Sequence, residues 1–273
     1  MGCPSGSRST IGNRVVERPR RFESCPHRLK IIFLNIWHGH VWDKLQEFIL
    51  GEAVTTDAFC FTEVGPELQT KLANLLPDYR PFYDELIRTD YLDGGIDGQG
   101  IFVKSGINVE NNGKQYVYKV TKKDCGVLQT MEIVINSRRV LIGSIHGKAQ
   151  PGHKLDTKAR IAQSKKTIEF FKNKNGPKII GGDFNLMPDT KSIEMFEKAG
   201  YRNLISDFKI KSTRNHFSWE QAERQYKENG DPFFERQDFA DYVFVSPGVK
   251  VKSFEVPNIE ISDHLPLILD FDI

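Results

Sequence analysis

Short apolar segments rich in β-branched and aromatic residues recur through residues 29–273, and they constrain the fold more than any other feature. Their length and the turn residues that bound them predict buried strands. Between them, apolar residues at helical spacing predict amphipathic helices. We therefore expect an α/β (α+β) fold with sheets packed together and helices outside. The predicted strands are 29–37, 56–64, 79–87, 100–106, a hairpin at 126–147, 177–185, 241–256 and 265–273, and the predicted helices are 43–52, 66–76, 154–172 and 191–200.

Residues 1–28 read as a separate segment, which leaves 29–273 as the folded domain. Residues 1–30 carry seven basic and two acidic side chains, a charge of +5, and the remaining residues carry 31 basic against 34 acidic, or −3. Three interpretations stay open: a basic arm that binds nucleic acid, a disordered tail, or a non-native extension. We favour the last, because codons for Arg21 to Ser24 permit the GTTCGA-type run of a transfer-RNA gene. Translation would then begin downstream of Met1 in the native protein.

Composition excludes several classes of protein. No apolar run approaches the roughly 18 residues of a membrane-spanning helix, so we expect no membrane segment. The polar, arginine-rich N-terminal residues predict no secretory signal. The four cysteines have no metal-type spacing such as CxxC, and we expect a reduced, cytoplasmic setting and a monomer. The net negative charge of the domain does not indicate a surface that coats DNA.

Nearly every predicted strand ends in, or is entered through, a side chain that can bind a metal ion or a phosphate. The segment KIIGGDFN, for example, places a carboxylate and a carboxamide two positions apart after an apolar strand. Strand ends and their loops are where rigid scaffolds display reactive groups. The pattern comprises Asn35, Glu63, His146, Asp183, Asn185, Asp241, Asp263 and His264.

Each of these residues alone has a structural explanation. Helix capping explains Glu63 or Asn35 equally well. An Asx turn explains Asp183 with Asn185, and a histidine such as His146 is often a satisfied core residue. We favour the functional interpretation because all members of the set occupy the same type of position.

Together the side chains supply the parts for attack by water on phosphorus. Glu63, Asp183 and Asp263 are hard oxygen donors, which suit Mg²⁺, with Mn²⁺ as the alternative, rather than zinc. Asn35 and Asn185 can hold a phosphate oxygen without repelling it. The two histidines of the set can donate to a phosphoryl oxygen as its charge grows. A metal, a base and charge-stabilising donors are the components of phosphoryl transfer to water.

The motifs resemble those of the endonuclease/exonuclease/phosphatase superfamily, which includes DNase I, exonuclease III, sphingomyelinases, inositol 5-phosphatases and tyrosyl-DNA phosphodiesterase. Six motifs occur in the order typical of that superfamily, although GDFN or SDH alone would be a weak signal. They are LNIW, FTEV, the strand-end histidine of SIHG, GGDFN, DYVFVS and SDH. The resemblance implies a four-layer sandwich, in which two mixed β-sheets pack face to face with helices outside, and a site at one end.

The resemblance also implies roles around a metal ion. Glu63 is expected as the principal metal ligand, with Asp263 and Asn35 nearby. Asp183 is expected to activate or orient the attacking water. The glycines before Asp183 are expected to let the chain approach the site closely.

A second group of residues is expected at the phosphate. Asn185 and His146 would hold it, and His264, paired with Asp241, would stabilise the transition state. Exonuclease III-like enzymes usually carry a tyrosine in a YxPN setting where this chain has His146. A histidine there is more similar to DNase I, the sphingomyelinases or the tyrosyl-DNA phosphodiesterase group.

We therefore predict a Mg²⁺-dependent phosphoesterase that hydrolyses a phosphodiester or phosphomonoester bond. A nuclease-like or DNA-end-processing phosphodiesterase is the first expectation, so nucleic acid is a possible substrate. A lipid or inositol phosphate phosphoesterase and a catalytically inactive binding module on the same fold are the alternatives.

Two segments are candidates for substrate contact. The first is the glycine-rich, acidic segment 90–99, which we expect to be a mobile loop. The second is 209–238, through Arg214, His216 and Trp219, although its aromatic residues serve equally well as anchors of a loop. In both cases the sequence alone leaves the substrate open.

Overall fold

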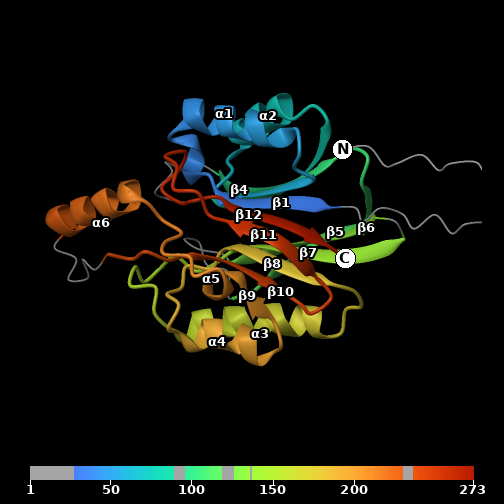
Figure 1. The fold of residues 1–273 in the computed structure, drawn as a ribbon. Coiled ribbons are helices and arrows are strands. Elements are labelled where there is room, and N and C mark those ends of the chain that lie inside the picture. Colours follow the sequence, from blue (N-terminus) through green and yellow to red (C-terminus); the bar gives the residue numbers. More distant parts are fainter. Residues whose placement is uncertain (1–27, 89–95, 119–125, 136, 230–235) are drawn as a thin grey trace, which may run out of the picture.

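Two six-stranded sheets form the centre of the molecule (Figure 1). The structure, a computed structural model, describes residues 28–88, 96–118, 126–135, 137–229 and 236–273. Across sheet A the strands are β11 (Lys250–Glu255), β12 (Leu267–Asp272), β1 (Leu29–Asn35), β2 (Ala58–Thr62), β4 (Ile96–Lys104) and β3 (Tyr79–Arg88). Across sheet B they are β5 (Asn108–Tyr116), β6 (Val127–Ile135), β7 (Arg138–His146), β8 (Lys178–Asp183), β10 (Asp241–Val245) and β9 (Arg202–Asn203).

Helices cover the outer face of each sheet, so the molecule has four layers (Figure 1). Sheet A is covered by α1 (Trp42–Ala53) and α2 (Pro66–Leu75), and sheet B by α3 (Lys158–Lys172) and α4 (Lys191–Lys198). Both sheets are mixed, since β1–β2 and β7–β8 are parallel pairs among antiparallel ones. The predicted four-layer αββα sandwich is therefore confirmed. The short segments are η1 (Trp37–Gly39) and α5 (Leu204–Asp207), and α6 (His216–Asn229) projects from one end.

The continuous apolar character of β1 follows from burial on both of its faces. Ile31 and Phe33 lie in the core between the two sheets. Ile32 and Leu34 lie in a second core, which sheet A forms with α1 and α2. A strand covered on both faces has no polar side to alternate with. Each fully buried side chain of this kind contributes on the order of 1.5–3 kcal/mol to folding.

The two glycines before Asp183 serve the packing of the sheets. A Cβ on Gly181 would lie 2.8 Å from the ring of Phe33, so the bare backbone lets sheet A approach sheet B here. Gly182 has φ +121°, and a Cβ there would lie 2.4 Å from the carbonyl oxygen of Ile145. Instead of an approach of the chain to the site, Gly181 allows sheet A to approach sheet B, and Gly182 allows β8 to lie close to β7 within sheet B.

Several predicted boundaries differ from the structure. The helix predicted over 154–172 begins at Lys158, because Thr157 caps it by accepting a hydrogen bond from the backbone N–H of Arg160. Residues 96–99, predicted as part of a loop, form the start of β4, and 90–95 lie outside the described residues. The sequence did not predict β5, whose side chains are mostly exposed, or α6, because the mainly polar residues of both give no apolar period.

The predicted catalytic and metal-binding residues lie at one edge of the sandwich. That edge holds the C-terminal ends of β1, β2, β7 and β8 and the N-terminal ends of β10 and β12. In Figure 1 the C-terminus, which follows β12, is at the right, so the start of β12 lies toward the left, on the side where α6 projects.

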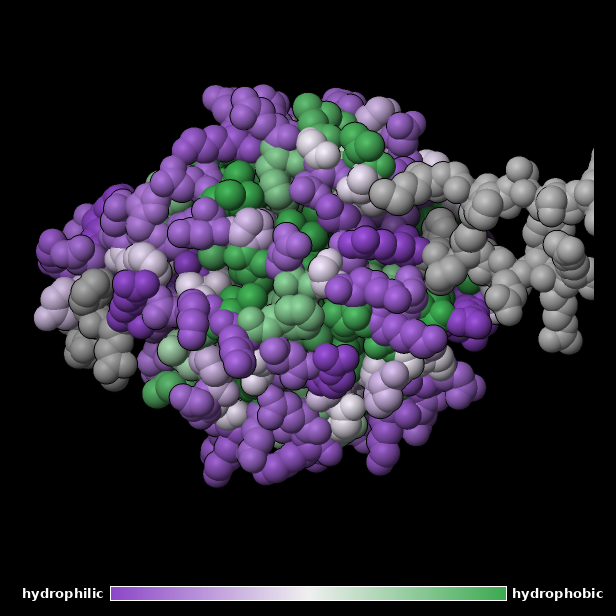
Figure 2. Space-filling model, viewed as in Figure 1, coloured by the Kyte–Doolittle hydropathy of each residue, from purple (hydrophilic) through white to green (hydrophobic). Residues whose placement is uncertain are grey.

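The outer surface is mainly hydrophilic over the helices, and apolar side chains show chiefly across the middle of the molecule, over the strands (Figure 2). In the part of the chain that the structure describes, no helix is both long and apolar enough to cross a membrane.

We expect Gly181→Ala to lower the free energy of unfolding by about 1–3 kcal/mol, because the added methyl group overpacks the contact with Phe33. Urea unfolding measures the change. Gly51→Ala is the matched control: Gly51 lies in α1, a Cβ there meets no atom within 4 Å, and alanine should stabilise the helix by up to about 1 kcal/mol. Equal stability of Gly181→Ala and the unaltered protein would contradict the packing argument.

Candidate active site

Strand pairing brings the acidic and histidine residues of both sheets together. Asp241 is paired in register with Asp183 across the antiparallel strands β10 and β8. His146, at the end of β7, is paired with Asp183 from the other side. Sheet A contributes its own residues to the same edge, because Asn35 ends β1 and Glu63 follows β2.

Asn35 connects the two sheets at the site. Its side-chain Nδ2 donates to Glu63 Oε1 at 2.9 Å and to Asp183 Oδ2 at 3.2 Å. Its Oδ1 accepts from the backbone N–H of Trp37 at 3.0 Å, which sets the orientation of the amide. Ser262 donates to the backbone carbonyl of Asn35 at 2.7 Å and ties the segment before β12 to the same point. One carboxamide thus holds a carboxylate from each sheet.

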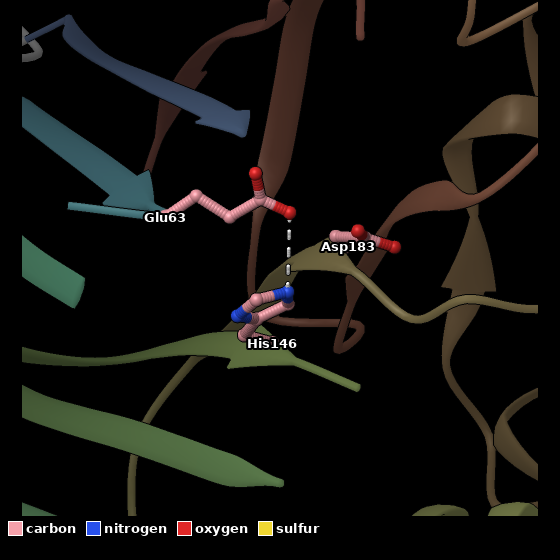
Figure 3. Close-up of side chains that lie close together, drawn as sticks. All are labelled: Glu63, His146 and Asp183. Atoms are coloured by element: carbon pink, nitrogen blue, oxygen red, sulfur yellow. Dashed lines mark ion pairs between the residues drawn. The ribbon is translucent and has the colours of Figure 1, made fainter. Parts of the chain in front are cut away.

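Glu63, His146 and Asp183 converge on one point (Figure 3). One ligand atom from each lies within 4.8 Å of the others, as a metal site requires. Glu63 has φ 59°, a left-handed backbone conformation that non-glycine residues seldom adopt and that is found at functional sites. Burial raises the pKa of Glu63, but the positive charges of His38 and His146 outweigh it, and the pKa is lowered.

A buried aspartate on β4 supports His146 from the other side. Asp97 Oδ2 lies 3.9 Å from His146 Nδ1, and His146 Nε2 lies 3.7 Å from Glu63 Oε1. Burial lowers the pKa of His146, but the two carboxylates raise it above the ordinary histidine value. The sequence missed Asp97 because IDGQG was interpreted as a loop, and no signal in that segment marks it as a strand.

His264 lies between three aspartates. Its Nδ1 contacts Asp241 at 2.8 Å and 3.0 Å, and its Nε2 lies 3.8 Å from Asp183 Oδ2 and 3.9 Å from Asp263 Oδ1. Burial lowers the pKa of His264, but the charges of Asp241, Asp263 and Asp183 raise it to about 9. The imidazole is therefore a cation at neutral pH, with Nε2 directed at the side of the site where Asp183 lies.

The donor set around Glu63 fits a hard divalent cation. It offers the carboxylates of Glu63 and Asp183, and the amide of Asn35 lies between them. Burial raises the pKa of Asp183, but His264 and Lys154 lower it, so its carboxylate stays charged. Charged oxygen donors are what Mg²⁺ and Mn²⁺ prefer. Among the described residues, Asp263 belongs to neither of the two clusters able to hold a metal, which are Glu63, His146 and Asp183, and Asp183, Asp241 and His264.

Asp263 contacts an arginine instead. Arg214 Nη2 lies 3.7 Å from Asp263 Oδ2, and Arg214 forms an isolated antiparallel bridge with His264. The predicted substrate contact Arg214 is therefore at the site. His216 is more exposed and faces Glu260 at 3.9 Å, and it has no recorded contact with the residues above.

Trp219 lies one turn into α6. The guanidinium of Arg236 stacks on its ring at 3.6 Å, and its buried indole nitrogen has no hydrogen-bond partner among the described residues. Phe233 and Phe234, which belong to the same candidate segment 209–238, lie outside the described residues.

Lys154 is a site residue that sequence reasoning missed. Its buried Nζ donates to Asn185 Oδ1, and Asn185 Nδ2 reaches only the carbonyl of Gly147, at 3.3 Å. The ammonium group therefore requires the oxygen of the amide to face it, and this directs the amide nitrogen of Asn185 toward the end of β7. The apolar spacing over 154–172 predicted a helix that included Lys154, and the sequence therefore did not indicate that Lys154 lies at the site.

The loop that carries Lys154 is held by a buried arginine of α3. Arg160, fully buried, donates to the backbone carbonyls of Lys148 (3.1 Å), Ala149 (2.9 Å), Pro151 (2.6 Å) and Leu155 (2.8 Å). A guanidinium can satisfy several carbonyls at once because its donors are fixed in one plane. One side chain thus holds four backbone carbonyls of the segment 148–155.

The segment after Asn35 also adopts an unusual backbone. Trp37, His38 and Gly39 have φ of 46°, 49° and 71° in succession. This conformation places His38 Nε2 3.3 Å from Glu63 Oε2. His38 therefore reaches the site, an outcome that the sequence left open. Strain of this kind persists where surrounding contacts over-determine it, as at functional sites.

Comparison with protein families and with solved structures identifies the class of protein to which this fold belongs. The profile of the Endonuclease/Exonuclease/phosphatase family matches residues 32–264. No curated protein sequence matches significantly. Solved structures of similar fold include a mannosyl-6-phosphatase from Bacteroides thetaiotaomicron, 18% identical with a TM-score of 0.68, over 90% of this chain and 100% of that one.

Two further structures have the same architecture. One is the human Nocturnin catalytic domain with bound sulfate anion, 20% identical with a TM-score of 0.63, over 90% of this chain and 94% of that one. The other is TDP2 of D. rerio complexed with a single-strand DNA product, 17% identical with a TM-score of 0.69, over 90% and 99%. At these identities the likeness shows the fold.

The chain belongs to the endonuclease/exonuclease/phosphatase family. Like the members of that family, it is an enzyme that hydrolyses phosphoester bonds.

We expect Arg160→Met to lower the free energy of unfolding by about 3 kcal/mol or more, because it leaves several buried carbonyls without donors. Hydrogen exchange should increase at residues 148–155 before the rest of the chain. Lys158→Met, an exposed change on the same helix, is the control and should alter neither. Unchanged exchange in the loop of the Arg160 variant would contradict the role given to this side chain.

The raised pKa of His264 predicts a pH dependence of stability. Because the folded state binds the proton more tightly than an unfolded chain with a histidine pKa of 6.5, the stabilisation is complete below pH 6.5 and is lost as pH rises to about 9. The loss is at most about 3 kcal/mol. In Asp241→Asn the largest of the three charges that raise the pKa of His264 is absent, so this decline should shrink. Urea unfolding in EDTA between pH 6 and 9.5 measures both proteins, and parallel curves would refute the assignment.

Proposed function

We propose that this enzyme is a Mg²⁺-dependent phosphoesterase that uses residues 29–273 to promote attack of water on a phosphate ester. The observation that carries the proposal is the convergence of Glu63, His146 and Asp183 from both sheets, with Asn35 between two of the carboxylates. Glu63 and Asn35 would hold the ion. When bound, Mg²⁺ supplies positive charge that stabilises the phosphoryl oxygens as negative charge develops on them. The sequence also assigned Asp263 to the metal, and its contact with Arg214 instead supports a role in positioning that arginine.

Asp183 is the group best placed to orient the attacking water. Its lowered pKa keeps it ionised at neutral pH. Asn35 and the backbone N–H of Asn185, at 2.8 Å, hold its two oxygens in place. An oriented carboxylate can accept a hydrogen bond from water and fix the direction of its lone pair.

Three side chains supply donors for the phosphate. His264 presents a charged Nε2–H, since Asp241 occupies its Nδ1. Asn185 presents its amide nitrogen, because Lys154 occupies the oxygen. His146, held between Asp97 and Glu63, is the third. Donors fixed before the reaction cost no reorganisation when charge grows on the phosphoryl group.

The bond cleaved in the cell is the finer part of the proposal. A nuclease-like or DNA-end-processing phosphodiesterase is supported by the likeness to TDP2, whose structure contains a single-strand DNA product. A phosphomonoesterase, with a lipid or inositol phosphate among its possible substrates, is supported by the likeness to a mannosyl-6-phosphatase and by two additional cations at the site, Lys154 and Arg214. An ionised Asp183 beside a charged His264 supports catalysis over an inactive binding module, because binding alone does not require this pair of groups.

We expect Asp183→Asn to reduce turnover roughly 10²- to 10⁴-fold, the range of a lost general base, while the protein stays folded. The assay is hydrolysis of a panel of nitrophenyl phosphate mono- and diesters and single-stranded DNA by the full chain in Mg²⁺, with EDTA as the second control. Glu63→Gln should in addition weaken Mg²⁺ binding in calorimetry. Near-normal turnover of Asp183→Asn, or full activity in EDTA, would overturn the proposed function.

A further inference from the structure

Two cations lie at the site to which the mechanism above assigns no direct contact with the phosphate. Lys154 is 7% exposed, and among the described residues the only hydrogen bond of its side chain is to Asn185. Arg214 has an 11% exposed side chain, and its Nε is buried with no hydrogen-bond partner among the described residues. Buried cations normally pair with a carboxylate at hydrogen-bonding distance. Within the part of the chain that the structure describes, neither group does so.

Backbone pairing directs Arg214 toward the catalytic histidine. Arg214 and His264 are direct antiparallel partners, and side chains of such partners project from the same side of the pair. Its Nη2 reaches Asp263 Oδ2 only at 3.7 Å, which is beyond a good hydrogen bond. Among the described residues, no carboxylate satisfies the remaining donors of this guanidinium at close range.

The two cations also act on one another. Burial, and then the charge of Arg214, lowers the pKa of Lys154 to about 8, while Asp183 and Asp241 act in the opposite direction. Two positive groups that repel each other in a buried place are costly unless an anion joins them. Together with the orphan donor of Arg214, this describes a site that an anion with several oxygens would complete.

We propose that Lys154 and Arg214 form a two-cation clamp for a terminal phosphate, so that the enzyme prefers phosphomonoesters to phosphodiesters. This inference rests on the proposed phosphoesterase function. A phosphomonoester carries nearly two negative charges at neutral pH and three non-bridging oxygens, whereas a diester carries one charge and two such oxygens. A second cation therefore adds more to the binding of the monoester. A nucleotide end and a small phosphorylated metabolite both present this group.

The test compares matched substrates. The kcat/KM of p-nitrophenyl phosphate relative to bis(p-nitrophenyl) phosphate is measured for the full chain and for Arg214→Gln and Lys154→Met. The clamp predicts that this ratio falls at least tenfold in either variant and is partly restored in Arg214→Lys and Lys154→Arg. Arg202→Gln removes an exposed arginine of β9, which pairs with Val245 at the C-terminal end of β10 and is bound to Asp207, and it should leave the ratio unchanged. Equal losses on both esters would overturn the clamp.

Failure of the clamp and failure of the proposed function give different results. If Asp183→Asn is inactive and the ester ratio is constant, only the clamp is wrong. If the unaltered protein hydrolyses neither ester, binding of inorganic phosphate by calorimetry decides: the clamp requires at least tenfold weaker binding in Arg214→Gln than in Arg202→Gln, and equal binding refutes it. Thermal unfolding shows whether each variant is folded. Phosphate binding by Arg214→Gln is compared with binding by Arg214→Lys, which retains the positive charge.

A further pair of substrates separates the two sources of the phosphate. Release of phosphate from a 5′-phosphorylated oligonucleotide is compared with release from a hexose 6-phosphate. If the clamp binds one of these substrates, Arg214→Gln should lower the kcat/KM for that substrate at least tenfold. Cleavage of internal phosphodiester bonds at a higher rate than either terminal phosphate would overturn the proposal.

Discussion

The apolar contact between the inner faces of the two sheets sets the geometry of everything at the site edge. Phe33 of sheet A lies directly over Gly181 of sheet B, two residues from the end of each strand. Because protein interiors are close-packed, this contact determines how far apart the strand ends lie. That separation allows Asn35 to reach Glu63 and Asp183 at once, at 2.9 and 3.2 Å. If the two sheets lay further apart, Asn35 could not contact both carboxylates, and the site residues of the two sheets would form two separate groups.

The charges at this edge then balance one another across the gap. Carboxylates come from both sheets, and the histidines that neutralise them are shared: His146 lies between Asp97 and Glu63, and His264 lies among three aspartates. A buried carboxylate would ordinarily take up a proton. Here the opposing histidines keep the pKa of Glu63 and Asp183 low. The site thereby keeps charged oxygen donors, which a divalent cation requires, in a place largely shielded from water.

Residues at some strand ends were predictable from the sequence, and others were not. Asp183 was identified because it follows an apolar run, and two glycines mark the end of that run. Asp97 was not, because its strand begins within a glycine-rich, acidic segment that has the composition of a loop. Lys154 was missed because the apolar spacing over 154–172 predicted a helix that included it, and the cap at Thr157 shows that the helix starts later. Periodicity identifies elements that bury one face, and these residues lie where elements begin.

The sequence by itself determined the class of fold and identified most of the polar residues that lie at the site edge, because buried strands need apolar runs and their polar ends stand out against them. The tertiary structure alone decided which polar residues meet. Arg214 and His264 are 50 positions apart in the chain, and their juxtaposition depends on a single antiparallel bridge. The position of Lys154 depends on the carbonyl contacts of Arg160. Such contacts join segments distant in sequence, and no local pattern of residues encodes them.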